Sequence, residues 1–137
     1  FFAPVILGGN LENLFFKKFQ IASPFFLIIG LLIFFFGVVI MIISLKDFYT
    51  NDESPAPFIE TKKIITTGIF KFTRNPMYVS FFISAFGIST ILSSLGILIG
   101  SIVGIFLLHR IVVLSEEIRL DNFDGYKKYK SKTRRWI

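Results

Sequence analysis

The chain has 137 residues, of which 53% are hydrophobic and 19 are phenylalanine, and its formal charge is +6. A soluble domain of this length could not bury so much apolar surface, so the composition favours an integral membrane protein. The absence of cysteine excludes disulfides, thiolate catalysis, cysteine-ligated metals and lipidation at cysteine. Basic residues gather at 62–74 and 127–135, which suits anionic lipid headgroups and argues against a nucleic-acid partner.

The first apolar stretch, Phe1 to Leu7, has neither the basic flank nor the small-residue cleavage site of a signal peptide. We expect it to be the tail of a truncated or atypical N-terminal membrane helix. The next apolar segment, 24–45, has no charged residue and about the 20 residues that a helix needs to cross a bilayer. Ser23 and Pro24 suit its start, because a hydroxyl can cap a helix and the missing N–H of proline costs little there.

Residues 46–73 form a polar connection, whose clearest loop signal is the run from Asn51 to Pro57. The following uncharged run, 75–108, would be about 50 Å long as one helix, well beyond the roughly 30 Å of bilayer hydrocarbon. A turn at 93–96 therefore predicts a helical hairpin with arms at about 76–93 and 96–115. The sequence thus predicts an all-α integral membrane protein with three clear transmembrane helices, and a single domain over residues 1–137.

The hairpin returns the chain to the side it left, so the polar connection and the tail from Ser115 should share one face of the membrane. Of the 15 Lys and Arg residues, only Lys17 and Lys18 fall on the other face. The positive-inside rule makes the shared face cytoplasmic. We therefore expect a multi-pass membrane protein whose site and C-terminus lie in the cytoplasm.

Ionisable residues at the edge of a membrane helix are costly to place, which makes His109, Arg110, Glu116 and Glu117 candidate site residues. In a continuous α-helix, seven residues make almost two turns, so His109 should align with Glu116 and Arg110 with Glu117. The four side chains would then face one side. Alternatively, Arg110 extends toward the headgroups and the glutamates mark where the helix enters water.

A second group of candidates precedes the hairpin, from Gly68 to Tyr78. Gly68 permits a close backbone approach, Asn75 is a natural N-cap, and Pro76 suits the first helical position. The amides at this helix start and the Arg74 guanidinium could hold a carboxylate or a phosphate. An ordinary capped helix with an arginine at the membrane surface would have the same sequence.

These segments occur in one order: Gly68, Arg74 to Tyr78, a hydrophobic hairpin, Glu116-Glu117, Tyr126 and Tyr129, and Arg134-Arg135-Trp136. Over about residues 68–136, this ordered set resembles the isoprenylcysteine carboxyl methyltransferase and phospholipid methyltransferase superfamily. The resemblance implies an S-adenosyl-L-methionine cofactor at the cytoplasmic end of the helices, bound within residues 64–137.

The resemblance also implies the roles of the candidate residues. The implied cofactor-binding residues are Gly68, Arg74, Asn75, Pro76, Tyr78, His109, Arg110, Glu116 and Glu117. The expected catalytic residues are Arg74, His109 and Glu116, and His109 or a glutamate would take a proton from an amine acceptor. The expected acceptor is lipid-like, such as a prenylcysteine carboxyl or a phospholipid amine that arrives from the membrane lipids, and no metal site is expected.

Two other functions fit parts of the sequence. A membrane oxidoreductase similar to the sterol reductases would have a related helical arrangement, and its nicotinamide cofactor would use the basic residues for its phosphates. A small transporter or non-catalytic membrane subunit would need ionisable groups near the middle of the bilayer, which the uncharged runs 25–45 and 77–108 do not offer. The methyltransferase is therefore the preferred hypothesis.

Overall fold

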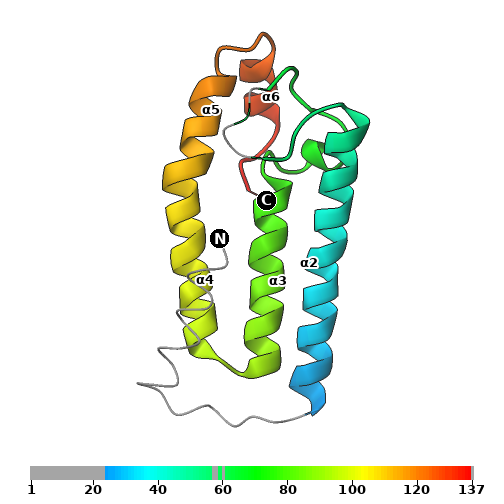
Figure 1. Cartoon of the computed structure of the whole chain (residues 1–137), viewed down its shortest axis with the longest axis vertical. Helices are drawn as coiled ribbons and strands as arrows, with labels where there is room; N and C mark the ends of the chain where they lie inside the picture. The colour runs from blue at the N-terminus through cyan, green and yellow to red at the C-terminus, as the bar shows by residue number, and fades with distance from the viewer. Residues whose placement is uncertain (1–23, 57–58, 60, 137) are drawn as a thin grey trace.

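The computed structural model describes residues 24–56, 59 and 61–136. In this part of the chain every regular element is helical, which confirms the predicted all-α class. The long helices lie side by side, with α3 (Pro76–Leu92) between α2 (Pro24–Thr50) and α4 (Leu95–Leu108) (Figure 1). The shorter elements are the 3-10 helix η1 (Gly68–Lys71), the π-helix η2 (His109–Val113), α5 (Leu114–Leu120) and α6 (Tyr126–Lys132).

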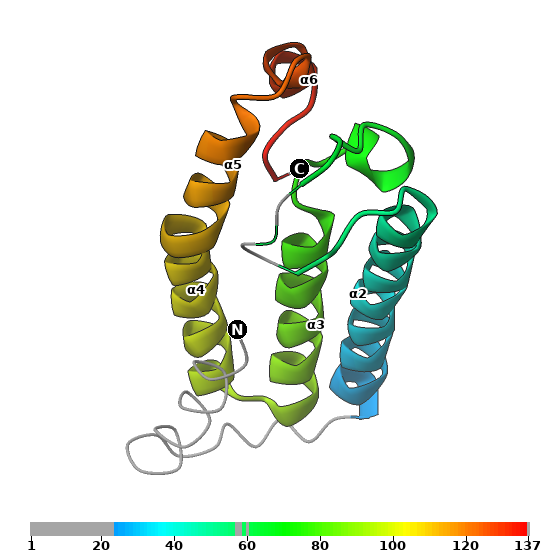
Figure 2. The ribbon, with the colours of Figure 1, turned by 45° about the horizontal axis from the view of Figure 1, so that its top comes forward.

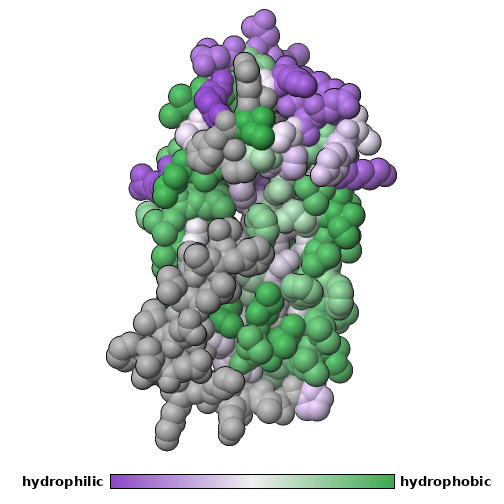
Figure 3. All heavy atoms as spheres, in the orientation of Figure 1, coloured by the Kyte–Doolittle hydropathy of each residue, from purple (hydrophilic) through white to green (hydrophobic). Residues whose placement is uncertain are grey.

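Among the described residues, two helical segments are long and apolar enough to cross a bilayer: α2, and the stretch Leu95–Leu120 that joins α4, η2 and α5. The apolar helix α3 has 17 residues and is about 25 Å long, slightly shorter than the hydrocarbon layer. Most large apolar side chains of α2 are exposed, as expected for a helix surrounded by lipid. Hydrophobic residues cover the helical body, whereas hydrophilic residues gather at the end that carries α6 (Figure 3).

The predicted helices are present, with differences at their ends. Helix α2 continues to Thr50, five residues beyond the predicted end, and the loop begins where Asp52 adopts a positive φ of 55°. The predicted hairpin turn is confirmed: Ser93 is left-handed, and the Ser94 side chain caps α4 by accepting from the Ile97 amide at 3.2 Å. The predicted N-terminal membrane segment lies outside the described residues.

Helices α2 and α3 pack together along small residues. Gly30, Gly37 and Ser44 recur every seven residues on α2, and all three are buried. A Cβ atom on Gly37 would lie 2.8 Å from the Ser84 backbone nitrogen, and one on Gly87 would lie 2.6 Å from the α2 backbone. Close backbone packing of this kind replaces the hydrophobic effect as the force between helices in lipid. It brings the start of α3 beside the end of α2.

The polar connection after α2 is held by two acidic side chains. The buried Glu53 carboxylate accepts from the backbone amides of Lys62 and Lys63, at 3.1 and 2.7 Å. At the end of α2, the Asp47 carboxylate accepts from the Ile69 amide at 2.9 Å. These bonds hold the connection near the start of α3.

The C-terminal tail, which we define as Thr133–Trp136, returns to the start of α3. The Arg134 carbonyl accepts from the Arg74 amide at 3.0 Å. The Arg135 carbonyl accepts from the Asn75 side-chain amide at 2.9 Å and from the Thr73 hydroxyl at 3.1 Å. The polar connection and the tail therefore lie at the same end of the molecule, as the sequence predicts (Figure 2).

Candidate functional site

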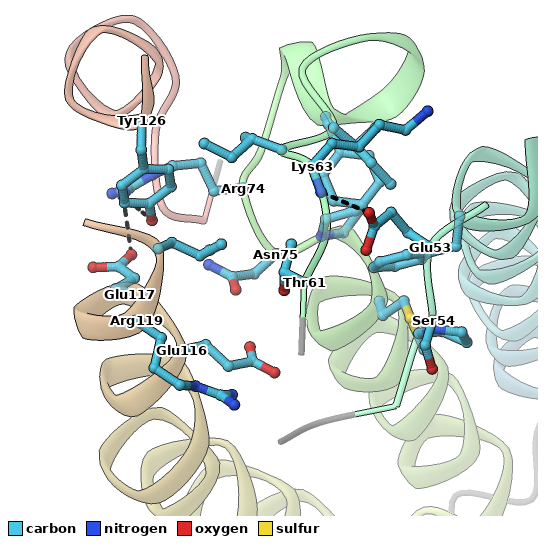
Figure 4. A pocket seen from close by; sticks show the side chains of 18 of the residues that line it. Glu53, Ser54, Thr61, Lys63, Arg74, Asn75, Glu116, Glu117, Arg119 and Tyr126 are labelled. Carbon is cyan, nitrogen blue, oxygen red and sulfur yellow. Dashed lines mark hydrogen bonds and ion pairs between the residues drawn. The ribbon is translucent and has the colours of Figure 1, made fainter. Parts of the chain in front are cut away.

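A cavity of about 320 Å³ lies at the polar end of the helices, within the range of roughly 300–1,000 Å³ that is typical of small-molecule sites. Its walls come from the connection after α2, the start of α3, α5 and the segment that leads into α6 (Figure 4). Isoleucine, leucine, methionine and phenylalanine side chains contribute its apolar lining. Its polar lining includes Glu53, Lys63, Arg74, Asn75, Tyr78, Glu116, Glu117, Arg119, Tyr126 and Tyr129.

Glu117 is bound by two arginines from distant parts of the chain. Its side chain is only 8% exposed, and its Oε1 atom lies 3.0 Å from Nη1 of Arg74. Arg135 forms two parallel bonds with the same carboxylate, from Nε to Oε1 at 2.9 Å and from Nη2 to Oε2 at 2.8 Å. The hydrogen bond to Glu117 raises the pKa of the Arg135 guanidinium. The three side chains thus form a charged cluster with a net charge of +1 at the cavity wall.

Arg74 is the member of this cluster that lines the cavity from the start of α3. Its side chain is 9% exposed, and Nη1 also donates to the Tyr126 hydroxyl at 3.3 Å. Its Nε atom is buried and has no hydrogen-bond partner among the described residues. A buried donor without an acceptor is costly, so an acceptor group placed beside this N–H would remove that cost.

Glu116 lies in a different environment from its neighbour Glu117. The Tyr78 hydroxyl is 3.4 Å from each of its carboxylate oxygens. This separation is long for a hydrogen bond between two oxygens, so the carboxylate keeps most of its capacity to accept from other groups. Glu116 is therefore the cavity carboxylate best able to bind a cation or a hydroxyl.

Asn75 and Pro76 occupy the predicted positions at the start of α3, and both line the cavity. The predicted capping bond is absent, however: the Asn75 side chain makes no hydrogen bond to the first turn. Its amide group donates to the Arg135 carbonyl instead. The first backbone amides of α3 are thus left without this side-chain acceptor.

Gly68 does not line the cavity. Its φ of +58° is in the left-handed region, and a Cβ atom there would collide with the Asp47 carboxylate. Glycine therefore allows η1 to begin directly against the end of α2, where the Phe70 ring packs edge-on against Phe48 at 5.3 Å. Gly68 therefore contributes to the cavity indirectly, because Phe70 of η1 is one of the lining residues.

His109 and Arg110 do not line the cavity either. Arg110 is exposed, with its guanidinium 5.4 Å from the centre of the Phe106 ring. His109 lies beside Trp136, with 5.7 Å between the ring centres, and its Nδ1 atom is buried without a partner among the described residues. The roles of His109 and Arg110 in cofactor binding or catalysis stay predictions.

The expected alignment of Arg110 with Glu117 is wrong because the helix is not α-helical throughout. Residues 109–113 form a π turn, which contains more residues per turn than an α-helix and shifts the register of everything after it. Arg110 therefore faces outward while Glu117 is buried. The four side chains do not share one face.

Glu53, Lys63 and Arg119 of the cavity lining were absent from the predicted site residues, and so were three residues that have a sequence signal: Tyr126, Tyr129 and Arg135. Tyr126 and Tyr129 line the cavity from α6, and burial raises the pKa of both hydroxyls. The Tyr129 hydroxyl donates to the Phe70 carbonyl at 2.7 Å, and Arg135 reaches Glu117 from the tail. The sequence signal for all three is the tyrosine pair and the final arginines in the ordered set.

The fold is that of an all-α membrane protein, with a cavity of the size typical of small-molecule sites at the polar end of its helices. The family model described as phospholipid methyltransferase matches residues 25–123, which is most of the chain. The chain belongs to the phospholipid methyltransferase family, and this family indicates a membrane methyltransferase. Comparisons with curated proteins and with solved structures give no match.

Proposed function

We propose that the protein is an S-adenosylmethionine-dependent methyltransferase that acts on a lipophilic acceptor at the cytoplasmic face of the membrane. The observation that carries this proposal is the cavity, whose lining combines Arg74, with an Nε–H that has no partner among the described residues, and the carboxylate of Glu116. Membership of the phospholipid methyltransferase family supports methyl transfer as the reaction.

The lining of the cavity fits the polar groups of S-adenosylmethionine. Arg74 and the amides at the start of α3 would bind the carboxylate of the methionine part. Glu116 would accept from the ammonium group or from the ribose hydroxyls. The aromatic face of Tyr78 would lie against the sulfonium or the adenine. Glu117 is already bound by two arginines, so it would act through Arg74.

S-adenosylmethionine supplies a methyl group on a sulfonium that is already a good leaving group. The protein then has chiefly to orient the acceptor and exclude water. An amine acceptor requires a base, and Glu116 is the carboxylate of the cavity with free acceptor capacity. His109, which the sequence also suggests as a base, does not line the cavity. A carboxylate acceptor would need no base.

The acceptor and the orientation are inferred from the surroundings of the cavity. Ile59, Met77, Leu120 and Phe123 give it an apolar lining that suits a lipid-like molecule arriving from the bilayer. The family name supports a phospholipid. The concentration of basic residues at this end supports a cytoplasmic site, since only Lys17 and Lys18 of the 15 Lys and Arg residues precede α2.

The proposal is tested by calorimetric titration of the detergent-purified protein with S-adenosylmethionine and S-adenosylhomocysteine. A reduced nicotinamide cofactor is titrated in parallel. Micromolar binding of the adenosyl ligands alone would support the methyltransferase and justify a screen of lipid acceptors. Binding of the nicotinamide cofactor alone would favour the reductase, and a folded sample that binds none of the ligands would overturn the proposal.

The site is tested by Arg74→Ala, with Lys71→Ala as the control. Arg74 lines the cavity, whereas Lys71 is exposed and lies outside it. Because the substitution removes a buried cation from the cavity, we expect S-adenosylhomocysteine to bind about 100-fold more weakly to Arg74→Ala. Lys71→Ala should bind like the wild type. Equal affinities of the two variants would overturn the assignment of Arg74.

A further inference from the structure

We propose that Arg135 is a positioning residue: by binding Glu117 it keeps the donors of Arg74 available to the cavity. No residue of the C-terminal tail lines the cavity, so Arg135 would act on a ligand through the other two side chains. This inference rests on the proposed function of the cavity as the cofactor site.

The first argument is the unequal way in which the two arginines share Glu117. Arg135 forms the two-point pair, with bonds of 2.9 and 2.8 Å to the two carboxylate oxygens. Arg74 has a single short contact, from Nη1 to Oε1 at 3.0 Å. Paired guanidinium and carboxylate groups favour the two-point geometry. Because Arg135 occupies it, Arg74 keeps its Nε–H without a partner among the described residues.

The second argument is that the tail is held at this place by its backbone, independently of the Arg135 side chain. The Arg135 carbonyl accepts from Thr73 and Asn75, and the Arg134 carbonyl accepts from the Arg74 amide. Thr133, which begins the tail, is also buried. The Arg135 side chain can therefore be changed while these bonds remain.

The third argument concerns charge. With both arginines in place, the buried carboxylate of Glu117 is overcompensated and the cluster has a net charge of +1. Without the guanidinium of Arg135, Glu117 and Arg74 become a neutral pair, and Glu117 can draw a second donor of Arg74 toward itself. The cavity would then lose both a hydrogen-bond donor and the charge that attracts an anionic group.

The inference predicts a selective effect on ligands that carry a carboxylate. S-adenosylhomocysteine has the amino-acid carboxylate, whereas methylthioadenosine shares the adenosyl part and lacks it. In Arg135→Ala we expect S-adenosylhomocysteine to bind about tenfold more weakly, and methylthioadenosine to bind as it does to the wild type. The affinity of Arg135→Lys for S-adenosylhomocysteine should lie between those of the wild type and Arg135→Ala, because lysine keeps the charge and cannot form the two-point pair.

Arg134→Ala is the control variant. It removes the same charge one position away, from a side chain that is exposed, and leaves the backbone bonds of the tail in place. It should bind both ligands like the wild type.

The position of the tail is measured through Trp136, the single tryptophan of the chain, which lies beside His109. If the backbone bonds hold the tail, the emission maximum of Trp136 in Arg135→Ala should match that of the wild type. A red-shifted emission together with equal weakening of both ligands would mean that the tail has left its place. That result would overturn the positioning role.

The remaining outcomes separate this inference from the proposed function. Wild-type protein that binds S-adenosylhomocysteine, with unchanged affinity in Arg135→Ala, would overturn the inference and leave the proposed function standing. Wild-type protein that does not bind S-adenosylhomocysteine would overturn the proposed function and the inference with it.

Discussion

Glu116 and Glu117 are adjacent in sequence, yet the structure gives them different tasks. Glu117 is buried between Arg74 and Arg135 and holds the start of α3 to the tail. Glu116 has long contacts with the Tyr78 hydroxyl, feels the charge of Arg119 and lines the cavity. One glutamate is therefore a candidate ligand-binding group, and the other is a structural anion whose removal leaves two cations unpaired.

Exchanging each glutamate for glutamine separates these tasks. Glu117→Gln should destabilise the protein by about 2 kcal/mol, less than the roughly 3–5 kcal/mol of breaking a fully buried pair, because Arg135 is 34% exposed. Glu116→Gln should weaken S-adenosylmethionine binding with little change in thermal stability. Thermal denaturation and calorimetry measure the two effects, and a larger loss of stability in Glu116→Gln would contradict the assignment.

The Tyr129 hydroxyl predicts a pH dependence of stability. Burial raises the pKa of Tyr129, and the hydroxyl donates to the Phe70 carbonyl at 2.7 Å. In the unfolded chain tyrosine loses its proton near pH 10, so the contribution of this group is constant below about pH 10 and falls as the pH rises further.

Thermal denaturation between about pH 8 and pH 11 tests this dependence. Tyr129→Phe should be about 1 kcal/mol less stable than the wild type at neutral pH, because it loses one hydrogen bond. Its stability should also decline less steeply above about pH 10, since one of the tyrosines with a raised pKa is gone. Equal alkaline slopes in the two proteins would show that Tyr129 does not contribute.

At the scale of the elements, the π turn η2 decides which side chains of the long helix reach the site. It lies between α4 and α5, so it leaves the apolar pattern of α4 unchanged and turns α5 relative to it. Glu116, Glu117, Arg119 and Leu120 of α5 then line the cavity, while Arg110 within the turn faces outward. In a continuous α-helix, a seven-residue spacing would place Arg110 and Glu117 on the same face. The sequence prediction failed here because the π turn changes the register between them.

The packing of α2 against α3 gives a prediction at the same scale. A Cβ atom on Gly87 would lie 2.6 Å from the Phe34 nitrogen and 2.8 Å from the Gly30 carbonyl oxygen. Because these are backbone atoms, the helices would have to separate, and Gly87→Ala should cost about 1–3 kcal/mol.

Thermal denaturation in one detergent measures this cost. Val39→Leu serves as the control because Val39 is half exposed on α2, so that added volume there can point away from the other described helices. The control should melt like the wild type. A Gly87→Ala variant as stable as the wild type would show that the small residues do not set the helix separation.

At the scale of the whole molecule, the polar and apolar parts are separated along the helix axes. The connection after α2, α5, α6 and the C-terminal tail form the polar end, and the turn between α3 and α4 lies at the opposite end (Figures 1 and 3). In the proposed function, this arrangement would let a soluble cofactor and a membrane lipid both reach the cavity. The proposed orientation has the polar end in the cytoplasm.

The orientation can be measured because the chain has no cysteine. Single variants Lys128→Cys, at the polar end, and Leu95→Cys, after the turn between α3 and α4, each introduce one exposed thiol. In intact cells a membrane-impermeant maleimide should label Leu95→Cys, and it should label Lys128→Cys only after the membrane is opened. The reverse pattern would place the site on the outer face.

The sequence by itself determined the all-α membrane class, the approximate positions of the described helices and the family resemblance. These properties depend on the length of apolar runs, the placement of charges and the order of short motifs, all of which are local. All the predicted site residues of the Arg74 to Tyr78 segment and both glutamates line the cavity. Helix ends and turn residues were also readable, as at Pro76 and Ser93.

Only the tertiary structure decided what the individual side chains do. Asn75 binds the Arg135 carbonyl, 60 positions away, instead of capping its own helix, and Glu117 is shared by arginines on opposite sides of it in sequence. The π turn moved Arg110 away from the site, and Gly68 serves the approach of η1 to Asp47. Such roles follow from contacts between distant segments, and a local sequence pattern carries no information about which of several possible partners will be within hydrogen-bonding distance.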